Sequence, residues 1–246
     1  MSYSMQLYFD FSGYSDMAVA LGLIFDKNLP LNFDSPYKSL SIIDFWRRWH
    51  ISLGTWVKNY IYIPLGGSRE GEMKKIRNVI LAMLFTGLWH GLGLTFIIWG
   101  AIHGFMLAIN HQWRRLGIKI PKFLAWLITF ICIVVCWVIF RADSFGNAFK
   151  IIESMFDFSN VAISAKFSTR VAFLKNYGFS FAKVIISDRE LRSIILATLV
   201  ALLLPNSTQL MKRFKPGIIW LIFTLTLALM SLMQFSDVAD FLYFKF

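Results

Sequence analysis

Four histidines are the side chains of this 246-residue chain best suited to moving a proton, and three of them stand in the uncharged stretch 79–112. His90 lies within FTGLWHGLGL (85–94), beside Trp89 and among glycines. Ionisable side chains are rare in lipid-embedded segments, where they mark pathways or active sites. Because burial disfavours a charged imidazole, we expect a neutral His90, the form that accepts a proton from a hydroxyl group. The alternative is a histidine that only hydrogen-bonds within a helix bundle.

The other three histidines are less distinctive. His50 follows two arginines and a tryptophan, a position that suits either an interfacial polar residue or a functional one. His103 lies thirteen residues after His90, about 220° further round an ideal helix, so the two rings converge only across a helix break. His111 is expected at the membrane edge. The sequence has no HxxH or HExxH spacing and no interleaved carboxylates, so we predict no metal site.

Another group of polar side chains stands near the start, in the aromatic segment YFDFSGYSDMA (8–18). Ser12 and Asp16 would share a helix face, whereas Asp10 and Asp16 would not. A polar cavity wall fits this pattern, and a plain helix cap at Asp10 or Ser12 fits it as well. The predicted lining of a substrate tunnel consists of Asp10, Ser12, Tyr14, Asp16, Trp89 and His103.

The composition indicates a membrane protein. Hydrophobic residues make up 57% of the chain and charged residues 16%, with a mean hydropathy of +0.59; charged residues make up about a quarter of an ordinary soluble domain. The net charge of +11 could suggest nucleic-acid binding, but the basic residues fall in short clusters between apolar runs. Such clusters are typical of loops that flank a membrane. We therefore expect a lipid bilayer as a partner, and no nucleic acid.

Four stretches contain no Asp, Glu, Lys or Arg: 79–112, 123–140, 193–211 and 216–236. A spanning helix needs about 20 apolar residues, so each of the last three is expected to cross once, 193–211 more weakly because of Pro205. As one helix, residues 79–110 would measure about 48 Å, too long for a hydrocarbon core of about 30 Å yet short for two crossings. The glycines there predict a discontinuous or re-entrant helix, with His90 near the break and facing a cavity.

Two further helices are expected outside these stretches. Ser41 and Asp44 match a capping box, and the helix that starts there carries the tryptophans and basic side chains of an interfacial helix. That helix should end at 64–67, where a proline and two glycines occur. An amphipathic helix should follow a cap at Asp143 or Ser144.

The expected fold is therefore an all-α, polytopic membrane protein with spanning, re-entrant and interfacial helices, forming a single domain over residues 1–246. Basic residues concentrate in cytoplasmic loops of membrane proteins. The clusters at 114–122 and 212–215 are accordingly expected on the cytoplasmic side, with segment 142–190 on the opposite side.

Six motifs occur in order along the chain: YFDFSGYSDMA (8–18), FWRRWHISLGTWVKNYIYIPLGG (45–67), GLWHG (87–91), WGAIHG (99–104), FRADSF (140–145) and FLYFKF (241–246). Together they resemble the membrane-bound O-acyltransferase family, specifically its alginate O-acetyltransferase-like branch, which is related to the teichoic-acid D-alanyl transfer protein. Members of that branch are longer, with several spanning helices before the first motif. The chain therefore resembles the C-terminal part of such an enzyme and is expected to lack the N-terminal helices.

The resemblance implies a multi-pass enzyme of the bacterial inner membrane. It implies transfer of an acyl group, acetyl in this branch, from a cytoplasmic thioester such as acetyl-CoA to an exported or cell-surface polysaccharide, with no bound cofactor. A companion extracytoplasmic acetyltransferase is an expected partner. His90 would be catalytic and His50 the second characteristic histidine. Four basic residues could attract a phosphorylated donor, although anchoring to lipid headgroups would explain them equally well: Arg47, Arg48, Lys58 and Arg69. The alternative is a non-catalytic subunit or inactive fragment that only scaffolds a polysaccharide-modification complex.

Overall fold

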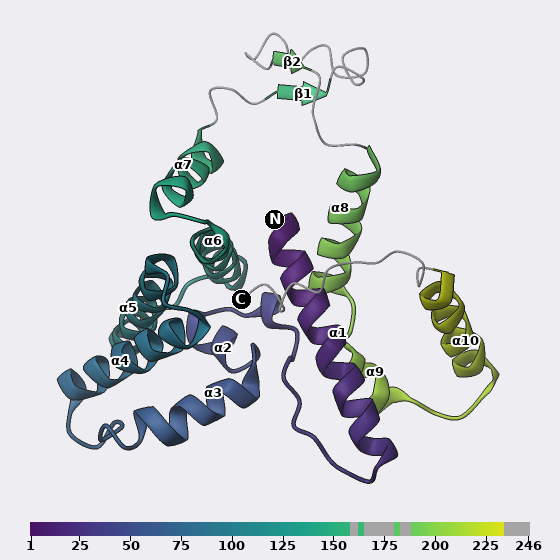
Figure 1. The fold of residues 1–246 in the computed structure, drawn as a ribbon, viewed down its shortest axis with the longest axis horizontal. Coiled ribbons are helices and arrows are strands. Elements are labelled where there is room, and N and C mark those ends of the chain that lie inside the picture. Colours follow the sequence, from purple (N-terminus) through teal and green to yellow (C-terminus); the bar gives the residue numbers. More distant parts are fainter. Residues whose placement is uncertain (158–161, 165–179, 183–187, 234–246) are drawn as a thin grey trace.

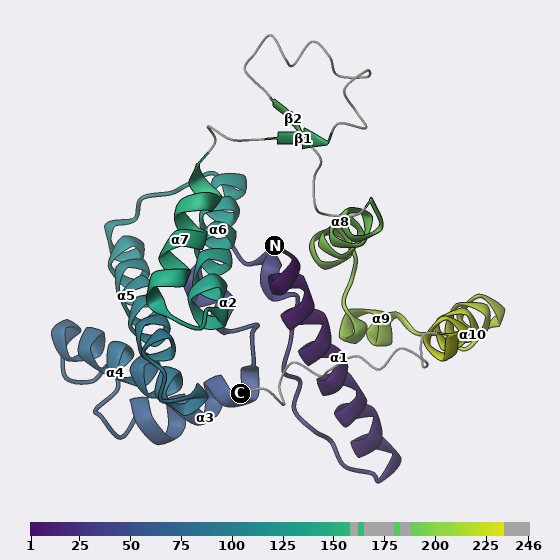
Figure 2. The same cartoon turned by 45° about the horizontal axis from the view of Figure 1, so that its top comes forward.

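The computed structural model describes residues 1–157, 162–164, 180–182 and 188–233, and most of them are helical. In chain order the elements are α1 (Ser2–Ile24), the 3-10 turn η1 (Pro36–Lys38), α2 (Ile42–Trp46), α3 (Ile51–Val57), the π-helical turn η2 (Lys58–Tyr62), α4 (Glu72–His90), α5 (Leu94–Leu116), α6 (Lys122–Arg141), α7 (Phe145–Phe156), β1 (Ala162–Ser164), β2 (Ser180–Ala182), α8 (Asp188–Leu203), α9 (Ser207–Arg213) and α10 (Ile218–Met233). Figures 1 and 2 show α2 to α7 gathered on one side of α1 and α8 to α10 on the other.

Two helices of the described residues, α5 and α6, are long and apolar enough to cross a bilayer. Helix α6 confirms the crossing expected at 123–140, with a mean hydropathy of 2.8. The run 193–211 forms α8 and α9, which together are long and apolar enough for one crossing, as expected. They are bent by 53° on either side of Pro205, whose ring cannot continue a helix. The run 216–236 contains α10, which has 16 residues where a crossing needs about 20. Residues 234–236 of that run lie outside the described residues.

The glycine-rich break expected near His90 lies at residues 91–93, between α4 and α5. The two helices extend beyond the uncharged run, back to Glu72 and on to Leu116, and they pack against each other as a hairpin. Helix α5 by itself has 23 residues and the length of a full crossing. This hairpin of two helices differs from the single interrupted helix that the sequence predicts. Both helices reach beyond the uncharged run, because charged side chains occupy their outer turns.

Glycines bring the backbones of α4 and α5 into direct contact. A Cβ atom added to Gly100 would lie 2.5 Å from the carbonyl oxygen of Met83 and 3.3 Å from the Cα atom of Gly87. One turn further, a Cβ atom on Gly104 would lie 2.9 Å from the Cα atom of Ile80. Small residues allow this close approach between helices in a membrane. The α4–α5 hairpin, which carries His90 at its turn, therefore depends on these glycines.

The interfacial helix predicted from Ser41 begins as expected but does not continue. The Ser41 hydroxyl accepts a hydrogen bond from the Asp44 backbone N–H at 3.2 Å, which confirms the cap. Helix α2 then ends at Trp46, and His50 adopts a left-handed backbone conformation with φ +43° before α3 starts. The break occurs because Asn32, from the loop after α1, binds the first backbone N–H groups of α3. Its carbonyl oxygen accepts from Ile51 N and its side-chain oxygen from Ser52 N.

The amphipathic helix predicted after residue 144 is α7, and its cap is Ser144, whose hydroxyl accepts from Asn147 N at 3.2 Å. Beyond it, β1 and β2 form a small parallel pair in which Ala162 lies opposite Ser180. The all-α expectation did not include this pair. The rest of the predicted 142–190 segment lies largely outside the described residues.

Aromatic rings form the core that joins α1, α2, α5 and α6. The Trp99 ring stacks on Trp137 at a centroid distance of 6.0 Å, and the Phe45 ring stacks on Trp49 at 5.6 Å. Such pairs add about 0.5–1.5 kcal/mol each beyond the burial of their area. These rings surround the motif histidines; the buried ones are Tyr8, Phe11, Phe33, Tyr37, Phe45, Trp49, Trp99, Trp137 and Phe140.

Candidate active site

His90 is the last residue of α4, and rings from three helices surround it. Its imidazole lies edge-on to Trp99 of α5 at 5.4 Å and to Phe140 of α6 at 5.1 Å. The neighbouring Trp89 contributes a third ring at 5.0 Å and is itself half exposed. These contacts hold the imidazole at the end of the hairpin, where it remains partly exposed.

His50, in the turn between α2 and α3, lies close to His90. A positive charge on His50 would disfavour protonation of His90. The His50 ring packs edge-on against Phe11 of α1 at 4.8 Å, and its Nδ1 atom lies 3.3 Å from the side-chain oxygen of Asn32. If Nδ1 donates to that oxygen, Nε2 carries the free lone pair. The structure thus brings together the two motif histidines.

Asn32 is a site residue that the sequence analysis missed. Its side-chain oxygen accepts hydrogen bonds from the Ser52 backbone N–H at 3.1 Å and from the Ser52 hydroxyl, and it also lies next to the His50 ring. Its side-chain NH₂ group donates to the Ser15 hydroxyl of α1 at 2.9 Å. Asn32 therefore links α1, the His50 turn and α3. No local motif marks it, because all these partners are distant in sequence.

Replacing Asn32 by alanine is expected to destabilise the protein by about 1–3 kcal/mol, because the Ser52 backbone N–H loses its acceptor. The His50 ring also loses a partner, so an activity that depends on His50 should fall more steeply than stability alone explains. Thermal unfolding in detergent and an activity assay measure the two effects. The matched control is Asn59→Ala, an exposed position in η2. Equal behaviour of the two variants would contradict the role of Asn32.

Burial lowers the pKa of His50 from 6.5 to about 4. In the unfolded chain the pKa returns to its ordinary value, so between these two values the unfolded state binds more protons. The stability that depends on neutral His50 is therefore complete above about pH 6.5 and is lost as the pH falls to about 4. We expect Tm to fall across this window, and His50→Gln to remove part of that fall. If the Tm of the unaltered chain and that of His50→Gln change with pH in the same way, the dependence of stability on neutral His50 is disproved.

His103 is fully buried inside the core. Its Nδ1 atom accepts a hydrogen bond from the Trp46 indole N–H at 3.2 Å, and its ring contacts Trp99 at 4.6 Å. Its Nε2 atom has no hydrogen-bond partner among the described residues. Because Trp99 also touches His90, His103 lies one ring away from the hairpin end.

The polar residues of α1 lie elsewhere. Ser12 and Asp16 line a pocket of about 260 Å³ between α1 and the α8–α9 bend, which also includes Asn206. Tyr14 is exposed and Asp10 half-buried, and neither belongs to that lining. Of the predicted tunnel residues, Ser12 and Asp16 therefore line this pocket, Trp89 and His103 lie in the aromatic surroundings of His90, and Asp10 and Tyr14 belong to neither group.

The largest described pocket, about 640 Å³, lies between α2–α3 and α4–α5. Its lining combines apolar side chains with basic ones, namely Arg47, Lys58, Lys75 and His111. Arg48 instead pairs with Asp44 at 2.9 Å. Trp46 forms part of the wall and lies 5.9 Å from Trp99, the ring that contacts His90.

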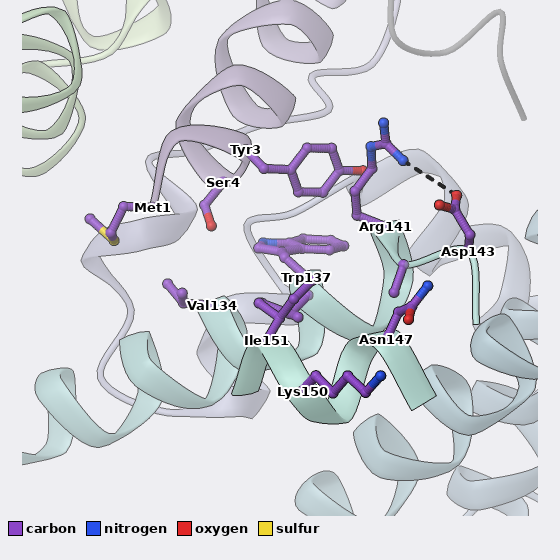
Figure 3. A pocket seen from close by; sticks show the side chains of 12 residues that line it. Met1, Tyr3, Ser4, Val134, Trp137, Arg141, Asp143, Asn147, Lys150 and Ile151 are labelled. Atoms are coloured by element: carbon purple, nitrogen blue, oxygen red, sulfur yellow. Dashed lines mark ion pairs between the residues drawn. The ribbon is translucent and has the colours of Figure 1, made fainter. Parts of the chain in front are cut away.

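A pocket of about 470 Å³ lies between α1, α6 and α7 (Figure 3). Because Phe140 touches His90, the end of α6 that borders this pocket lies at the same end of the helices as His90. The 640 Å³ pocket extends toward the other end, where Glu72 pairs with Arg115 at 3.4 Å. Neither pocket includes His90 or His50 in its lining. In the part of the chain that the structure describes, no three His, Cys, Asp or Glu side chains are grouped to hold a metal ion.

The sequence is similar to those of several known proteins. The chain is 41% identical over 260 residues to the peptidoglycan O-acetyltransferase of Helicobacter pylori, covering all of this chain and 48% of that protein. It is 50% identical over 168 residues to the probable alginate O-acetylase AlgI of Pseudomonas aeruginosa, covering 67% of this chain and 32% of that protein. The teichoic acid D-alanyltransferase of Bacillus subtilis is 32% identical over 160 residues, covering 59% and 40%.

The chain thus spans about half the length, or less, of these relatives. Residues 1–145, which contain both motif histidines, match the family model for membrane-bound O-acyltransferases. This match confirms the resemblance seen in the ordered motifs, and the helices long enough to cross a bilayer agree with it. The chain is a multi-pass membrane protein and belongs to the membrane-bound O-acyltransferase family.

Proposed function

We propose that this chain carries the catalytic centre of an O-acyltransferase that moves an acetyl group from a cytoplasmic thioester to an exported or cell-surface polysaccharide. The proposal depends on one observation above all: His90 stands at the end of the α4–α5 hairpin, close to His50 and among rings from three helices. The similarity to a peptidoglycan O-acetyltransferase and to a probable alginate O-acetylase supports acetyl as the transferred group.

The 640 Å³ pocket is the proposed donor site. Arg47, Lys58 and Lys75 supply positive charge for the phosphates of a carrier such as acetyl-CoA, and the apolar part of the lining suits its uncharged arm. The pocket extends toward the end of α5 that carries Arg114 and Arg115, a cluster expected on the cytoplasmic side. A thioester that moves from there to His90 must pass Trp46 and Trp99.

In the proposed reaction, neutral His90 accepts the proton of an acceptor hydroxyl as its oxygen attacks the thioester carbonyl carbon. The new carbon–oxygen bond forms, the carbon–sulfur bond breaks, and the imidazolium returns the proton to the departing thiolate. The intermediate bears a negative oxygen that needs hydrogen-bond donors. Helix α5 starts at Leu94, directly after the break. The N–H groups of Phe96 and Ile97 donate to the Gly93 carbonyl oxygen at 3.1 and 3.4 Å, which leaves those of Leu94 and Thr95 ahead of the first bonded turn. These N–H groups are the proposed donors.

His50 is proposed to orient the acceptor hydroxyl. Its low pKa keeps the ring neutral at physiological pH, and its contact with Asn32 leaves one ring nitrogen to accept a hydrogen bond. The acceptor is reached directly or through a companion acetyltransferase outside the membrane. A non-catalytic scaffold remains the second candidate, because the chain spans about half the length of its relatives.

Reconstitution tests the proposal. The chain is inserted into proteoliposomes with radiolabelled acetyl-CoA on one side and the polysaccharide, with or without a companion transferase, on the other. We expect alkali-labile label in the polymer, as an O-ester requires. If the inserted chain transfers no label in either arrangement, while a full-length relative does so in the same assay, the chain is a scaffold or an inactive fragment.

A further inference from the structure

The ring of Trp46 stands at the end of the 640 Å³ pocket that faces the α4–α5 turn. It contacts two rings of α5, that of Trp99 at 5.9 Å and that of His103 at 5.3 Å. At this level of α5, a Cβ atom added to Gly100 would lie 2.5 Å from the carbonyl oxygen of Met83, which also lines the pocket. Trp46 and Met83 therefore belong to the inner end of the pocket.

This inner end lies one helical turn from His90. Thr86 lines the pocket, is buried and precedes His90 by four residues, so the two side chains share a face of α4. The lining includes neither His90 nor Trp99, and the rings of Trp46 and Trp99 separate the pocket from the imidazole. An acyl group that leaves the pocket for His90 must pass beside the Trp46 indole.

Basic side chains gather at the other end of the pocket. Arg47, Lys75 and His111 all line it, and the charges of Arg47 and Lys75 act on His111. Lys75 precedes Thr86 by eleven residues of α4, a distance of about 16 Å along a helix. A donor whose phosphates bind these side chains therefore extends its uncharged arm and its thioester toward Trp46.

A buried hydrogen bond fixes the orientation of the Trp46 ring. Its indole N–H donates to the Nδ1 atom of His103 at 3.2 Å, and His103 is fully buried. Because Nδ1 accepts this bond, a neutral His103 ring carries its proton on Nε2. An indole has no other polar group, so this one bond decides how the ring of Trp46 is turned.

From these observations we propose that Trp46 restricts the donor to a short acyl group such as acetyl, and that His103 is the positioning residue that holds the Trp46 ring. A longer chain must displace that ring, because protein interiors have no spare volume for added methylene groups. Displacing it also breaks the bond to His103 and leaves a buried N–H group unsatisfied. The inference rests on the proposed function and adds the residues that select the acyl group.

Thioether analogues of the donor test this inference, because their chain is not attached through a thioester and cannot be transferred. S-ethyl- and S-hexyl-coenzyme A are titrated by calorimetry into the chain in nanodiscs, and the heats of protein-free nanodiscs are subtracted. We expect the hexyl analogue to bind the unaltered chain no more tightly than the ethyl analogue. It should bind Trp46→Ala at least tenfold more tightly than the ethyl analogue, since each buried methylene group contributes about fourfold in affinity.

Further variants assign this preference to the Trp46–His103 pair. His103→Leu removes the acceptor and should also favour the hexyl analogue, whereas His103→Asn offers an oxygen in place of Nδ1 and should retain the preference of the unaltered chain. The matched control is Trp56→Ala, which removes an exposed tryptophan of α3 outside the pocket lining and should retain it as well. Thermal unfolding shows which variants are folded.

Several results would overturn the proposal. Tighter binding of the hexyl analogue to the unaltered chain would do so, and so would an unchanged preference in folded Trp46→Ala. If folded His103→Leu keeps the preference of the unaltered chain while Trp46→Ala loses it, the positioning role of His103 is removed and that of Trp46 stands.

This test is separate from that of the proposed function, because binding of a thioether requires no transfer. The expected preference without acetyl transfer in proteoliposomes would support the role of Trp46 and remove the catalytic proposal. Equal rates of transfer from acetyl- and hexanoyl-coenzyme A by the unaltered chain would leave catalysis intact and remove the role of Trp46. If neither analogue binds the unaltered chain, the role of Trp46 falls whether or not transfer occurs.

Discussion

Replacing His90 by alanine is expected to lower acetyl transfer by about 10²–10⁴-fold, the usual contribution of a general base. The ring is held by aromatic contacts at the end of α4 and has no described hydrogen bond that the fold depends on. Membrane insertion and thermal stability should therefore change little. Initial rates of label transfer in proteoliposomes, with the amount of inserted protein determined separately, measure the effect.

Two further variants make that result interpretable. His90→Gln retains a polar side chain but cannot take up the proton, so it should be as inactive as alanine. Leu88→Ala removes an exposed side chain from the same turn of α4 and should transfer normally. Transfer by His90→Ala at the rate of the Leu88 control would show that another group acts as the base, or that chemistry does not limit the rate.

The second large effect is expected at the helix crossing, where valine in place of Gly100 should prevent α4 and α5 from packing. Its Cβ atom would lie 2.5 Å from the Met83 carbonyl oxygen, and that oxygen belongs to backbone that cannot move aside. Overpacking costs about 1–3 kcal/mol where side chains can adjust, and more where only backbone is available. We expect lower Tm, protease cleavage in the 91–93 turn and loss of transfer.

The matched control is Gly13→Ala, in the middle of α1. A Cβ atom there meets nothing within 4 Å, and alanine is favoured over glycine in helices by about 0.5–1 kcal/mol. This variant should be at least as stable as the unaltered chain. If Gly100→Val were also as stable, the close approach of α4 and α5 would not support the position of His90.

Local features of the fold could be predicted because their causes lie within short segments. The cap at Ser144 depends on a residue three positions away, and the break at 91–93 follows from glycines that disfavour a continuous helix. The span at α6 needs only a run of apolar residues. The errors arose where distant segments intervene: the helix from Ser41 stops before His50 because Asn32 captures the start of α3.

By itself, the sequence determined that this is a helical membrane protein, where α6 crosses, which residues begin several helices, and the family, since each depends on composition, spacing or ordered motifs. Only the tertiary structure decided that His50 is near enough to His90 for its charge to act on it, that Asn32 holds the His50 turn, and that a pocket containing Arg141 borders α6 one turn from Phe140. The physical reason is that hydrogen bonds and ring contacts between distant segments leave no periodic trace in either segment. They exist only once the chain has folded.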